Sequence, residues 1–460
     1  MLFNSLQFLF FFLVVTLLYY RMPYQKQRIW LLLIASCYFY MSFVPKYLLI
    51  LAGTIIIDYI AGILISNSTG KQRKGWLTLS IVVNAGILIY FKYFNFLLDT
   101  IAPAVTPLFP YIKLPYLDIL LPIGLSFHTF QAMSYTIEVY RGKQAPETNF
   151  VVYALYVMFY PQLVAGPIER PQNILPQLHE HKAYNWDNVK EGFARMLWGF
   201  FKKVVIADRL AIAADYAHNH TGLSAWALWV GAMFYSVQIY CDFSGYSDIA
   251  LGAAKVMGIT LMENFKQPYI SKSITEFWTR WHISLSSWFR DYVYIPLGGS
   301  KRGEARRKIN VFIVFLLSGI WHGANFTFII WGALHGILVT LLPNRKSRKA
   351  KMVSGIFFTI INFLAVTVCW VFFRAHTVAY AFDFVKGMFT FNGGVSYFGL
   401  NTYELILSTA LVAILMVREY KYRRHLIRSN TRFFAFCGLM MAVCYFLGVF
   451  GENQFIYFQF

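Results

Sequence analysis

The sequence predicts an all-α protein that crosses a membrane many times. Of its 460 residues, 58% are hydrophobic and only 13% are charged, whereas a water-soluble domain carries about 25% charged residues. The hydrophobic residues occur in repeated runs long enough for a helix to cross the hydrocarbon core of a bilayer. We therefore expect one polytopic bundle of about 11 transmembrane helices, with additional re-entrant or interfacial helices, because every backbone hydrogen bond must be satisfied inside lipid.

The formal net charge is +20, and the Lys and Arg side chains fall mostly in short loops between the apolar runs. The simplest explanation is the positive-inside rule, which places basic loops in the cytoplasm. An alternative is that these loops also attract an anionic substrate or the acidic headgroups of membrane lipids. In this setting the charge does not indicate a nucleic-acid partner.

The five cysteines form neither a CxxC pair nor a Cys/His zinc pattern. All of them lie in or beside apolar segments, so we expect small buried side chains and neither a disulfide framework nor a metal site. They are Cys37, Cys241, Cys369, Cys437 and Cys444.

The N-terminal part of the chain predicts four spans, at residues 1–20, 29–44, 47–66 and 76–98. The first apolar run has no basic residue before it, which favours a retained span over a cleaved signal peptide. Basic clusters follow the first and third spans, and this alternation places the N-terminus outside the cytoplasm. A long connection with several prolines follows, at residues 99–117.

The next segments combine apolar runs with polar groups. Residues 118–140 predict a fifth span, and its polar side chains should face the interior of the bundle. Residues 151–168 are interrupted by two prolines and a glycine, which favours a bent or re-entrant segment. Residues 169–191 are polar and predict a surface loop. The polar side chains of the fifth span are His128, Gln131, Ser134 and Glu138.

Two further segments lead to the centre of the chain. Residues 192–216 mix charged and apolar side chains and predict an amphipathic helix near the cytoplasmic face. Residues 226–257 predict another span, which contains Asp242 and Asp248. Residues 258–276 are polar and predict an interfacial segment.

Residues 276–336 concentrate ionisable side chains in apolar surroundings. Burying such groups is unfavourable by several kcal/mol each unless they are paired or functional. We therefore expect a buried or re-entrant helix at 277–297 and interpret the whole stretch as a candidate reaction centre. The side chains concerned are His282, His322, His335, Arg280, Arg290 and Asp291.

The second half of this stretch predicts a pair of helices. One ascends from a basic loop at residues 301–308, and the other descends to the basic cluster at 345–351. At a rise of about 1.5 Å per residue, His322 lies roughly 20 Å above Lys308, at the deep end of the pair. Three more spans follow, at about 353–373, 403–417 and 433–450, and leave both termini outside the cytoplasm.

A neutral imidazole is the side chain best suited to accept a proton at physiological pH. For His322, at a helix break deep in the bundle, catalysis and a satisfied polar core residue are both open interpretations. For His128 and His335 the structural interpretation is favoured. The sequence contains no GxSxG elbow, Walker loop or GxGxxG motif, and a base without its own nucleophile fits direct acyl transfer from a thioester to a hydroxyl.

Six stretches carry a more specific pattern. They follow one another along essentially the whole chain and resemble the membrane-bound O-acyltransferase (MBOAT) family, in the bacterial branch typified by the membrane subunit of alginate O-acetyltransferases. Two positions depart mildly from the family pattern: Glu138, where Asp is expected, and Phe326, where Trp is common. The stretches are FHTFQAMSYTIEVYRG (127–142), YPQLVAGPIERP (160–171), YCDFSGYSDIALG (240–252), FWTRWHISLSSWFRDYVYIPLGG (277–299), GIWHGANFTFIIWGALHG (319–336) and FIYFQF (455–460).

The resemblance implies a bundle whose middle thins into a central funnel. The donor, acetyl-CoA, would approach from the cytoplasm and the acceptor from outside, with no permanently bound cofactor. The resemblance assigns His322 as general base and His282 as the group that positions or polarises the acyl carbonyl. Arg302, Arg306 and Lys308 are candidates for contacts with the phosphates of coenzyme A, although topology alone also explains them.

The resemblance also implies one transmembrane domain over residues 1–460. Its parts would be N-terminal spans (1–117), a catalytic core (about 118–343), C-terminal spans (353–450) and a periplasmic tail (451–460).

The tail contains FIYF, which resembles a short motif whose tyrosine is proposed to carry the acyl group. Tyr457 is thus a candidate acyl relay to a periplasmic SGNH-type partner, with an aromatic interfacial anchor as the alternative.

The expected activity is O-acetylation of an exported, alginate-like polysaccharide by an enzyme of the bacterial inner membrane. The same chemistry on peptidoglycan, teichoic acid or another cell-surface glycan is an alternative. A transporter or flippase, whose buried polar groups would line a substrate path, is an alternative of a different class.

Overall fold

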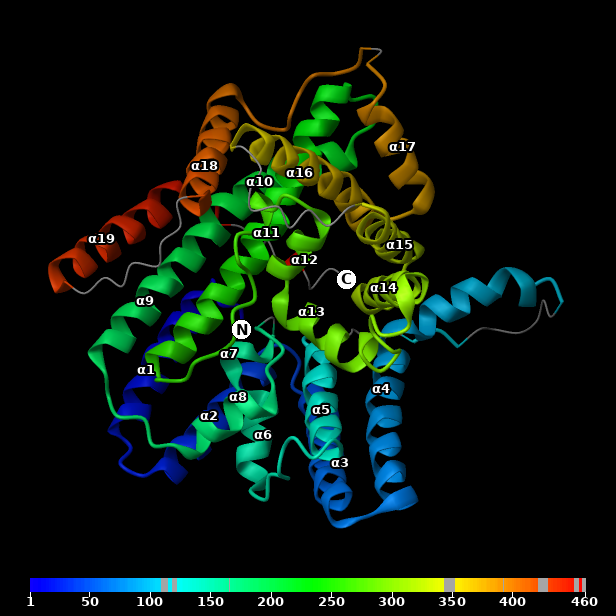
Figure 1. Ribbon diagram of the computed structural model, residues 1–460. Coiled ribbons are helices and arrows are strands. Elements are labelled where there is room, and N and C mark those ends of the chain that lie inside the picture. The colour runs from blue at the N-terminus through cyan, green and yellow to red at the C-terminus, as the bar shows by residue number, and fades with distance from the viewer. Residues whose placement is uncertain are drawn as a thin grey trace. The chain divides into compact units, whose positions relative to one another are not determined.

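The computed structural model is built from helices (Figure 1), and no β-strand is present among the residues that it describes, which confirms the all-α prediction. The chain divides into two compact units: unit 1 comprises Met1–Val189 and Ala253–Met262, and unit 2 comprises Lys190–Gly252 and Glu263–Phe460. The described residues are 1–108, 115–117, 122–164, 166–342, 352–391, 393–420, 429–450 and 455–456.

Unit 1 contains the first eight helices, and the predicted spans at residues 29–44, 47–66 and 76–98 are all present as helices. The bounds are α1 Leu6–Arg21, α2 Gln25–Met41, α3 Tyr47–Asn67, α4 Gly70–Val105, α5 Leu125–Tyr140, α6 Phe150–Met158, α7 Tyr160–Leu163 and α8 Pro171–His179.

Helices α3, α4 and α5 pack together around a buried carboxyl group. Asp58 on α3 is fully buried. Its Oδ1 accepts a hydrogen bond from the Ser80 hydroxyl at 2.6 Å, and its Oδ2 accepts one from the Asn84 amide at 2.8 Å. The Ser80 hydroxyl also lies 3.0 Å from that of Thr136 on α5. These bonds satisfy a group that would otherwise be costly to bury, and they link the three helices.

The segment after α5 is bent where the sequence predicts a bend: α6 ends at Met158 and α7 begins at Tyr160. The predicted surface loop at 169–191, in contrast, is wrong in part, because α8 lies within it. Pro171 occupies the first turn of α8, where its missing N–H has no intrahelical partner to lose. The helix also has a buried apolar face, formed by Ile174, Leu175 and Leu178.

Unit 2 contains most of α9 and α11 and all the remaining elements. The bounds are α9 Trp186–Phe200, η1 Phe201–Ala207, α10 Asp208–Asn219, α11 Ala225–Val256, η2 Pro268–Ile270, α12 Ile274–Arg280, α13 Ile283–Phe289, η3 Arg290–Tyr294, α14 Gly303–His322, α15 Phe326–Leu341, α16 Met352–Arg374, α17 Val378–Met388, α18 Thr402–Tyr420 and α19 Asn430–Leu447.

The α9–η1 segment and α11 touch through glycines. A Cβ atom on Gly199 would lie 2.6 Å from the carbonyl oxygen of Gly245, and a Cβ on Gly245 would lie 2.8 Å from that of Gly199. About two helical turns away, a Cβ on Gly252 would lie 2.5 Å from the carbonyl oxygen of Gly192. Only residues without a side chain permit this backbone contact.

The close contact buries charged residues that we expected at a surface. We predicted an amphipathic helix near the cytoplasmic face at 192–216, but Lys202 and Lys203 are both buried. Lys202 Nζ lies 2.6 Å from Asp248 Oδ2, and Lys203 Nζ lies 2.8 Å from Asp242 Oδ1. The expectation of exposure is wrong because carboxylates on α11 satisfy the two ammonium groups inside the protein.

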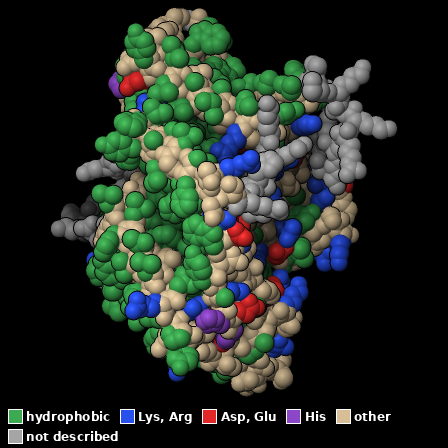
Figure 2. Space-filling view, turned by 90° about the vertical axis from the view of Figure 1, so that its left-hand side faces the viewer, with side chains coloured by type: hydrophobic (Ala, Val, Ile, Leu, Met, Phe, Trp, Pro, Cys, Tyr) green, Lys and Arg blue, Asp and Glu red, His purple; other side chains and the backbone are tan. Residues whose placement is uncertain are grey.

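Four described helices are long and apolar enough to cross a membrane: α3, α4, residues Gly355–Arg374 of α16, and α19. Their exposed positions carry large apolar side chains, such as Leu49 on α3, which is 76% exposed, and Phe446 on α19, which is 78% exposed. Hydrophobic side chains cover broad areas of the face drawn in Figure 2. The chain is therefore a multi-pass membrane protein, and the number of about 11 crossings stays a prediction.

Helices α14 and α15 form the predicted pair, side by side in unit 2 (Figure 1). A Cβ on Gly319 would lie 2.3 Å from the carbonyl oxygen of Phe328, and a Cβ on Gly332 would lie 2.4 Å from that of Phe315. The two helices are thus in backbone contact near the turn that joins them, which fixes the end of α14.

We expect Gly319→Val to separate α14 from α15 and to destabilise the protein by about 1–3 kcal/mol, the usual cost of overpacking a filled contact. The measurement is the thermal unfolding temperature of the purified protein in detergent. Gly438→Ala on α19 is the control, because a Cβ there has no neighbour within 4 Å. Equal unfolding temperatures for the two variants would contradict the packing described here.

Candidate active site

His322 is the last residue of α14 and is buried by aromatic rings. Only 5% of its surface is exposed. Its ring centroid lies 4.9 Å from that of Trp321, 5.0 Å from that of Trp331 and 5.2 Å from that of Phe373. The carbonyl end of a helix favours positive charge, so the position suits a side chain that gains a proton during a reaction.

The turn after His322 is held at two points. A Cβ on Gly323 would lie 2.1 Å from the Phe328 ring, so this residue must lack a side chain. Asn325 caps α15 by accepting the Thr327 N–H at 3.0 Å, and its own amide donates to the carbonyl oxygen of His376 at 2.9 Å. The break after α14 is therefore a defined structure that holds His322 in place.

His282 lies between α12 and α13 in a left-handed backbone conformation, with φ 42° and ψ 55°. Non-glycine residues adopt this conformation uncommonly, and such residues often occur at functional sites. The side chain is 1% exposed. Its ring meets Phe243 of α11 edge to face, with a centroid distance of 4.7 Å.

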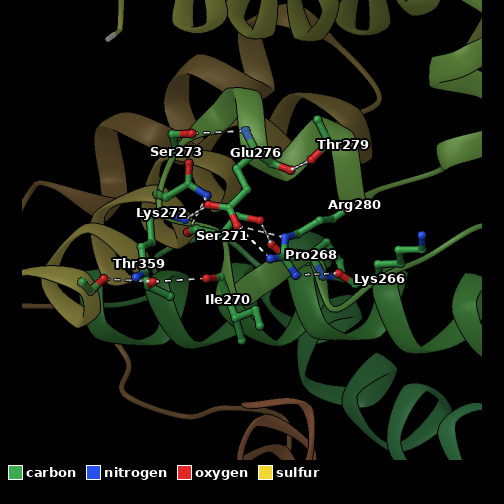
Figure 3. Close-up of polar contacts among 12 residues, drawn as sticks. Lys266, Pro268, Ile270, Ser271, Lys272, Ser273, Glu276, Thr279, Arg280 and Thr359 are labelled. Carbon is green, nitrogen blue, oxygen red and sulfur yellow. Dashed lines mark hydrogen bonds and ion pairs between the residues drawn. The ribbon is translucent and has the colours of Figure 1, made fainter. Parts of the chain in front are cut away.

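Helix α12, which leads to His282, is stabilised at both ends (Figure 3). Ser273 caps its start by accepting the Glu276 N–H at 3.2 Å, and Glu276 accepts the Lys272 N–H at 2.9 Å. Glu276 also pairs with Arg280 at 2.8 Å, and Arg280 donates to the carbonyl oxygen of Lys266 at 3.1 Å. Arg280 is thus a support for this helix.

Arg290 and Asp291, the other two charged residues of the predicted centre, are not fully buried as expected. Arg290 pairs with Asp291 at 2.8 Å, but its side chain is 63% exposed. The predicted helix at 277–297 is present as two short helices, α12 and α13, followed by the wider turn η3. Because Arg290 is exposed, it does not share the buried environment of the histidines.

Asn264 fixes the orientation and the tautomer of His282, a role that no sequence pattern indicates. Its Oδ1 accepts the Ser284 backbone N–H at 3.2 Å and the Ser284 hydroxyl at 2.9 Å. A backbone N–H only donates, so the atom that faces it is the amide oxygen. His282 Nδ1, 3.1 Å from the same oxygen, therefore carries the proton, and the lone pair of the neutral ring is on Nε2.

Trp321 and Trp331 connect His282, His322 and His335, which all lie in unit 2. The Trp321 ring contacts both His322 and His282, the latter at a centroid distance of 6.4 Å. The Trp331 ring contacts both His322 and His335, each at 5.0 Å. The fold thus gathers side chains that are separated in sequence around two indole rings.

Two histidines have partners that fit a structural role. His335 is fully buried, and its Nδ1 accepts a hydrogen bond from Trp278 Nε1 at 3.3 Å. In unit 1, the His128 ring lies 2.6 Å from the carbonyl oxygen of Leu163, to which Nε2 must donate. Each contact gives one ring nitrogen a partner in the protein interior, which supports a structural role for these two residues.

The remaining candidates lie elsewhere or outside the described residues. Arg302 and Arg306 are exposed and Lys308 is half-buried, all at the start of α14 and so at the opposite end from His322. Lys308 is roughly 20 Å from His322 along the helix. Tyr457 lies outside the described residues.

Comparison with known proteins gives the same family that the motifs indicate. The model of the membrane-bound O-acyltransferase family matches residues 143–382. The probable alginate O-acetylase AlgI of Pseudomonas aeruginosa is 41% identical over 91% of this chain and 82% of its own length. The peptidoglycan O-acetyltransferase of Helicobacter pylori is 36% identical over 85% and 80%. The teichoic acid D-alanyltransferase of Bacillus subtilis is 30% identical over 55% and 67%.

We expect His335→Ala to lower stability by about 2–4 kcal/mol, because it removes the acceptor of Trp278 and leaves a cavity. His335→Gln keeps a polar side chain that can accept the same hydrogen bond and should retain more of the stability. Thermal unfolding of the purified variants measures both effects. A His335→Ala protein that unfolds at the same temperature as the unmodified protein would rule out the structural role.

Proposed function

Because the chain belongs to the membrane-bound O-acyltransferase family and is an acyltransferase, we propose that it moves an acetyl group from acetyl-CoA across the membrane for O-acetylation of an exported, alginate-like polysaccharide. The relatives named as alginate O-acetylases support the acetyl group and the glycan. The observation that carries the mechanism is the position of His322, buried at a helix end and sharing the Trp321 ring with His282.

The proposed reaction forms one C–O bond and breaks one C–S bond. The oxygen of an acceptor hydroxyl attacks the thioester carbonyl carbon while its proton passes to the His322 imidazole. The tetrahedral intermediate then collapses, the C–S bond breaks, and the thiolate of coenzyme A takes the proton from His322. The carbonyl groups at the end of α14 stabilise the transient imidazolium, and His322 is neutral again at the end of the cycle.

His282 acts beside this base. With its proton fixed on Nδ1 by Asn264, neutral His282 presents an acceptor at Nε2, which positions a hydroxyl or thiol group. It polarises the acyl carbonyl only when Nε2 is also protonated, because a carbonyl oxygen needs a donor. The Asn264 contact thus selects between the two roles that the sequence left to this residue.

Basic residues near the start of α14 support the binding of acetyl-CoA. Arg302 and Arg306 are exposed near the start of α14, and guanidinium groups bind phosphate oxygens through paired hydrogen bonds. Lys308 adds a third positive charge on the same helix. These residues would hold the phosphates of coenzyme A at the cytoplasmic end of a helix whose other end carries His322.

The acceptor side of the proposal includes a relay. The Tyr457 hydroxyl would receive the acetyl group and pass it to a periplasmic SGNH-type acetyltransferase, which would complete the transfer to the polysaccharide. This relay requires an inner-membrane protein whose C-terminal tail lies outside the cytoplasm, in keeping with the proposed orientation of both termini. Mass spectrometry of the C-terminal peptide after incubation with acetyl-CoA tests it, and a peptide that stays unmodified during turnover would remove the relay.

Peptidoglycan is the second candidate acceptor, because a peptidoglycan O-acetyltransferase is 36% identical over 85% of this chain. Assays with oligoalginate and with peptidoglycan fragments, each with the purified partner protein, distinguish the two. No relative reported above is named as a transporter or flippase, and the family assignment favours the transferase.

We expect His322→Ala to lower the release of coenzyme A thiol from acetyl-CoA by about 10²–10⁴-fold, the usual contribution of a general base. His335→Gln is the matched control, since it alters a neighbouring buried histidine with a structural partner. The assay is thiol release by purified protein in detergent or nanodiscs. Unchanged thiol release in His322→Ala would disprove the assignment of the base.

We expect Asn264→Ala to reduce the rate of acetyl transfer by about 10- to 100-fold, because His282 loses its orientation and its fixed tautomer. Asn264→Asp retains an oxygen acceptor for His282 Nδ1–H and for Ser284, and should restore most of the rate. Turnover and the unfolding temperature are measured on the same samples. If Asn264→Asp is as slow as Asn264→Ala, the acceptor oxygen is not what matters.

A further inference from the structure

The last described residues of the chain lie inside unit 2 against α11. Phe455 is 1% exposed and Ile456 is 3% exposed. The Phe455 ring stacks on that of Tyr246, with centroids 4.4 Å apart, and also contacts Phe243 at 5.8 Å. Phe455 therefore packs within the protein.

The end of α19 and the residues just after it are held by two hydrogen bonds to their backbone groups. The Leu447 carbonyl oxygen accepts a bond from Arg209 at 2.8 Å, and the Val449 N–H donates to the carbonyl oxygen of Val204 on η1 at 2.8 Å. Ile456 makes a further attachment to unit 2.

The attachment at Ile456 involves a buried charge. Asp242 on α11 accepts the Ile456 N–H through Oδ2 at 2.7 Å. Its Oδ1 lies 2.8 Å from the Lys203 ammonium, which also binds Asp208 at 2.9 Å. The hydrogen bond is charge-assisted and buried, and bonds of this kind are stronger than neutral ones. Because the ammonium occupies Oδ1, the other oxygen is directed to the tail.

We propose that Asp242 is a positioning residue that fixes the register of the C-terminal segment against α11. Apolar packing of Phe455 alone would tolerate sliding, because the hydrophobic effect is not directional. A hydrogen bond to one backbone N–H admits a single register. It fixes the residue that directly precedes Tyr457, and Phe243, which contacts Phe455, also contacts the His282 ring at 4.7 Å.

The functional meaning of this contact rests on the proposed relay through Tyr457. If that tyrosine accepts an acetyl group, the preceding residue must be held while the hydroxyl approaches the thioester, since misplacing a reactant by about 1 Å can cost 10²-fold in rate. Asp242 supplies that fixed point through the backbone N–H of Ile456.

The first test removes the hydrogen-bond donor, the backbone N–H of Ile456, and leaves Asp242 unchanged. Ile456→Pro deletes the backbone N–H but keeps an apolar side chain, whereas Ile456→Ala keeps the N–H and loses side-chain packing. Purified full-length variants are digested with carboxypeptidase, and release of the terminal residues is followed by mass spectrometry. We expect release at least about tenfold faster in Ile456→Pro than in Ile456→Ala. Equal or reversed rates would overturn the proposal.

The second test changes the hydrogen-bond acceptor, the Asp242 side chain. Asp242→Ala should expose the tail to carboxypeptidase, and Asp242→Asn should restore much of the protection, because an amide oxygen still accepts the N–H. Asp208→Asn is the matched control, since it removes the other carboxylate partner of Lys203 and makes no contact with Ile456. If Asp208→Asn exposes the tail as much as Asp242→Ala, loss of local stability explains the result and the proposal fails.

A third measurement separates this inference from the relay. Acetylation of the C-terminal peptide is followed in the same variants during turnover of acetyl-CoA. Two results together support positioning for transfer. Tail acetylation is lost in Ile456→Pro and in Asp242→Ala, and it is recovered when Asp242 is replaced by Asn instead of Ala. The variants can also show the expected differences in carboxypeptidase release while no sample carries acetyl on Tyr457. That result supports the contact between Asp242 and Ile456 and refutes the relay. Full acetylation in Ile456→Pro refutes the positioning role.

Discussion

Backbone contact between α9–η1 and α11 is the constraint on which much of unit 2 depends. Gly199 and Gly245 bring the two segments so close that a single methyl group on either would collide with the other. At that separation, Lys203 reaches Asp242 across the contact, and the carboxylate is both neutralised and oriented. Its second oxygen then binds the backbone N–H of Ile456. The contact between these glycines thus determines where the Asp242 carboxylate is buried and which groups it binds.

The histidines show that burial alone does not distinguish a candidate catalytic group from a structural one. His282, His322 and His335 are all buried by aromatic neighbours. His335 accepts a hydrogen bond from an indole, which fits a residue that stabilises the packing of α15. His322 ends a helix and is followed by a glycine that only a close turn explains. The difference lies in backbone position and hydrogen-bond partners.

Much of the fold was predictable from the sequence, because the helices of a membrane protein follow from the length and composition of its apolar runs. The positions and partners of charged residues were less predictable from the sequence. Lys203 pairs with a carboxylate on another helix, and Ile456 binds a residue 214 positions away. Neither partner is visible in local periodicity. Asn264 was missed for the same reason: nothing distinguishes one amide in a polar stretch until the chain places it against a histidine. Helix α8 was missed because its prolines and polar residues resemble those of a loop, while its short buried face depends on contacts with other helices.

The left-handed conformation of His282 limits which residues can replace it. Asparagine, aspartate and glycine tolerate this backbone region, whereas β-branched and bulky residues are strained there. A branched replacement would therefore damage the turn between α12 and α13 as well as remove the imidazole, and its phenotype would mix the two effects. Among polar residues, asparagine alters the chemistry while sparing the turn. The range of residues acceptable at this position is thus set first by the geometry of the main chain and only then by what the side chain does.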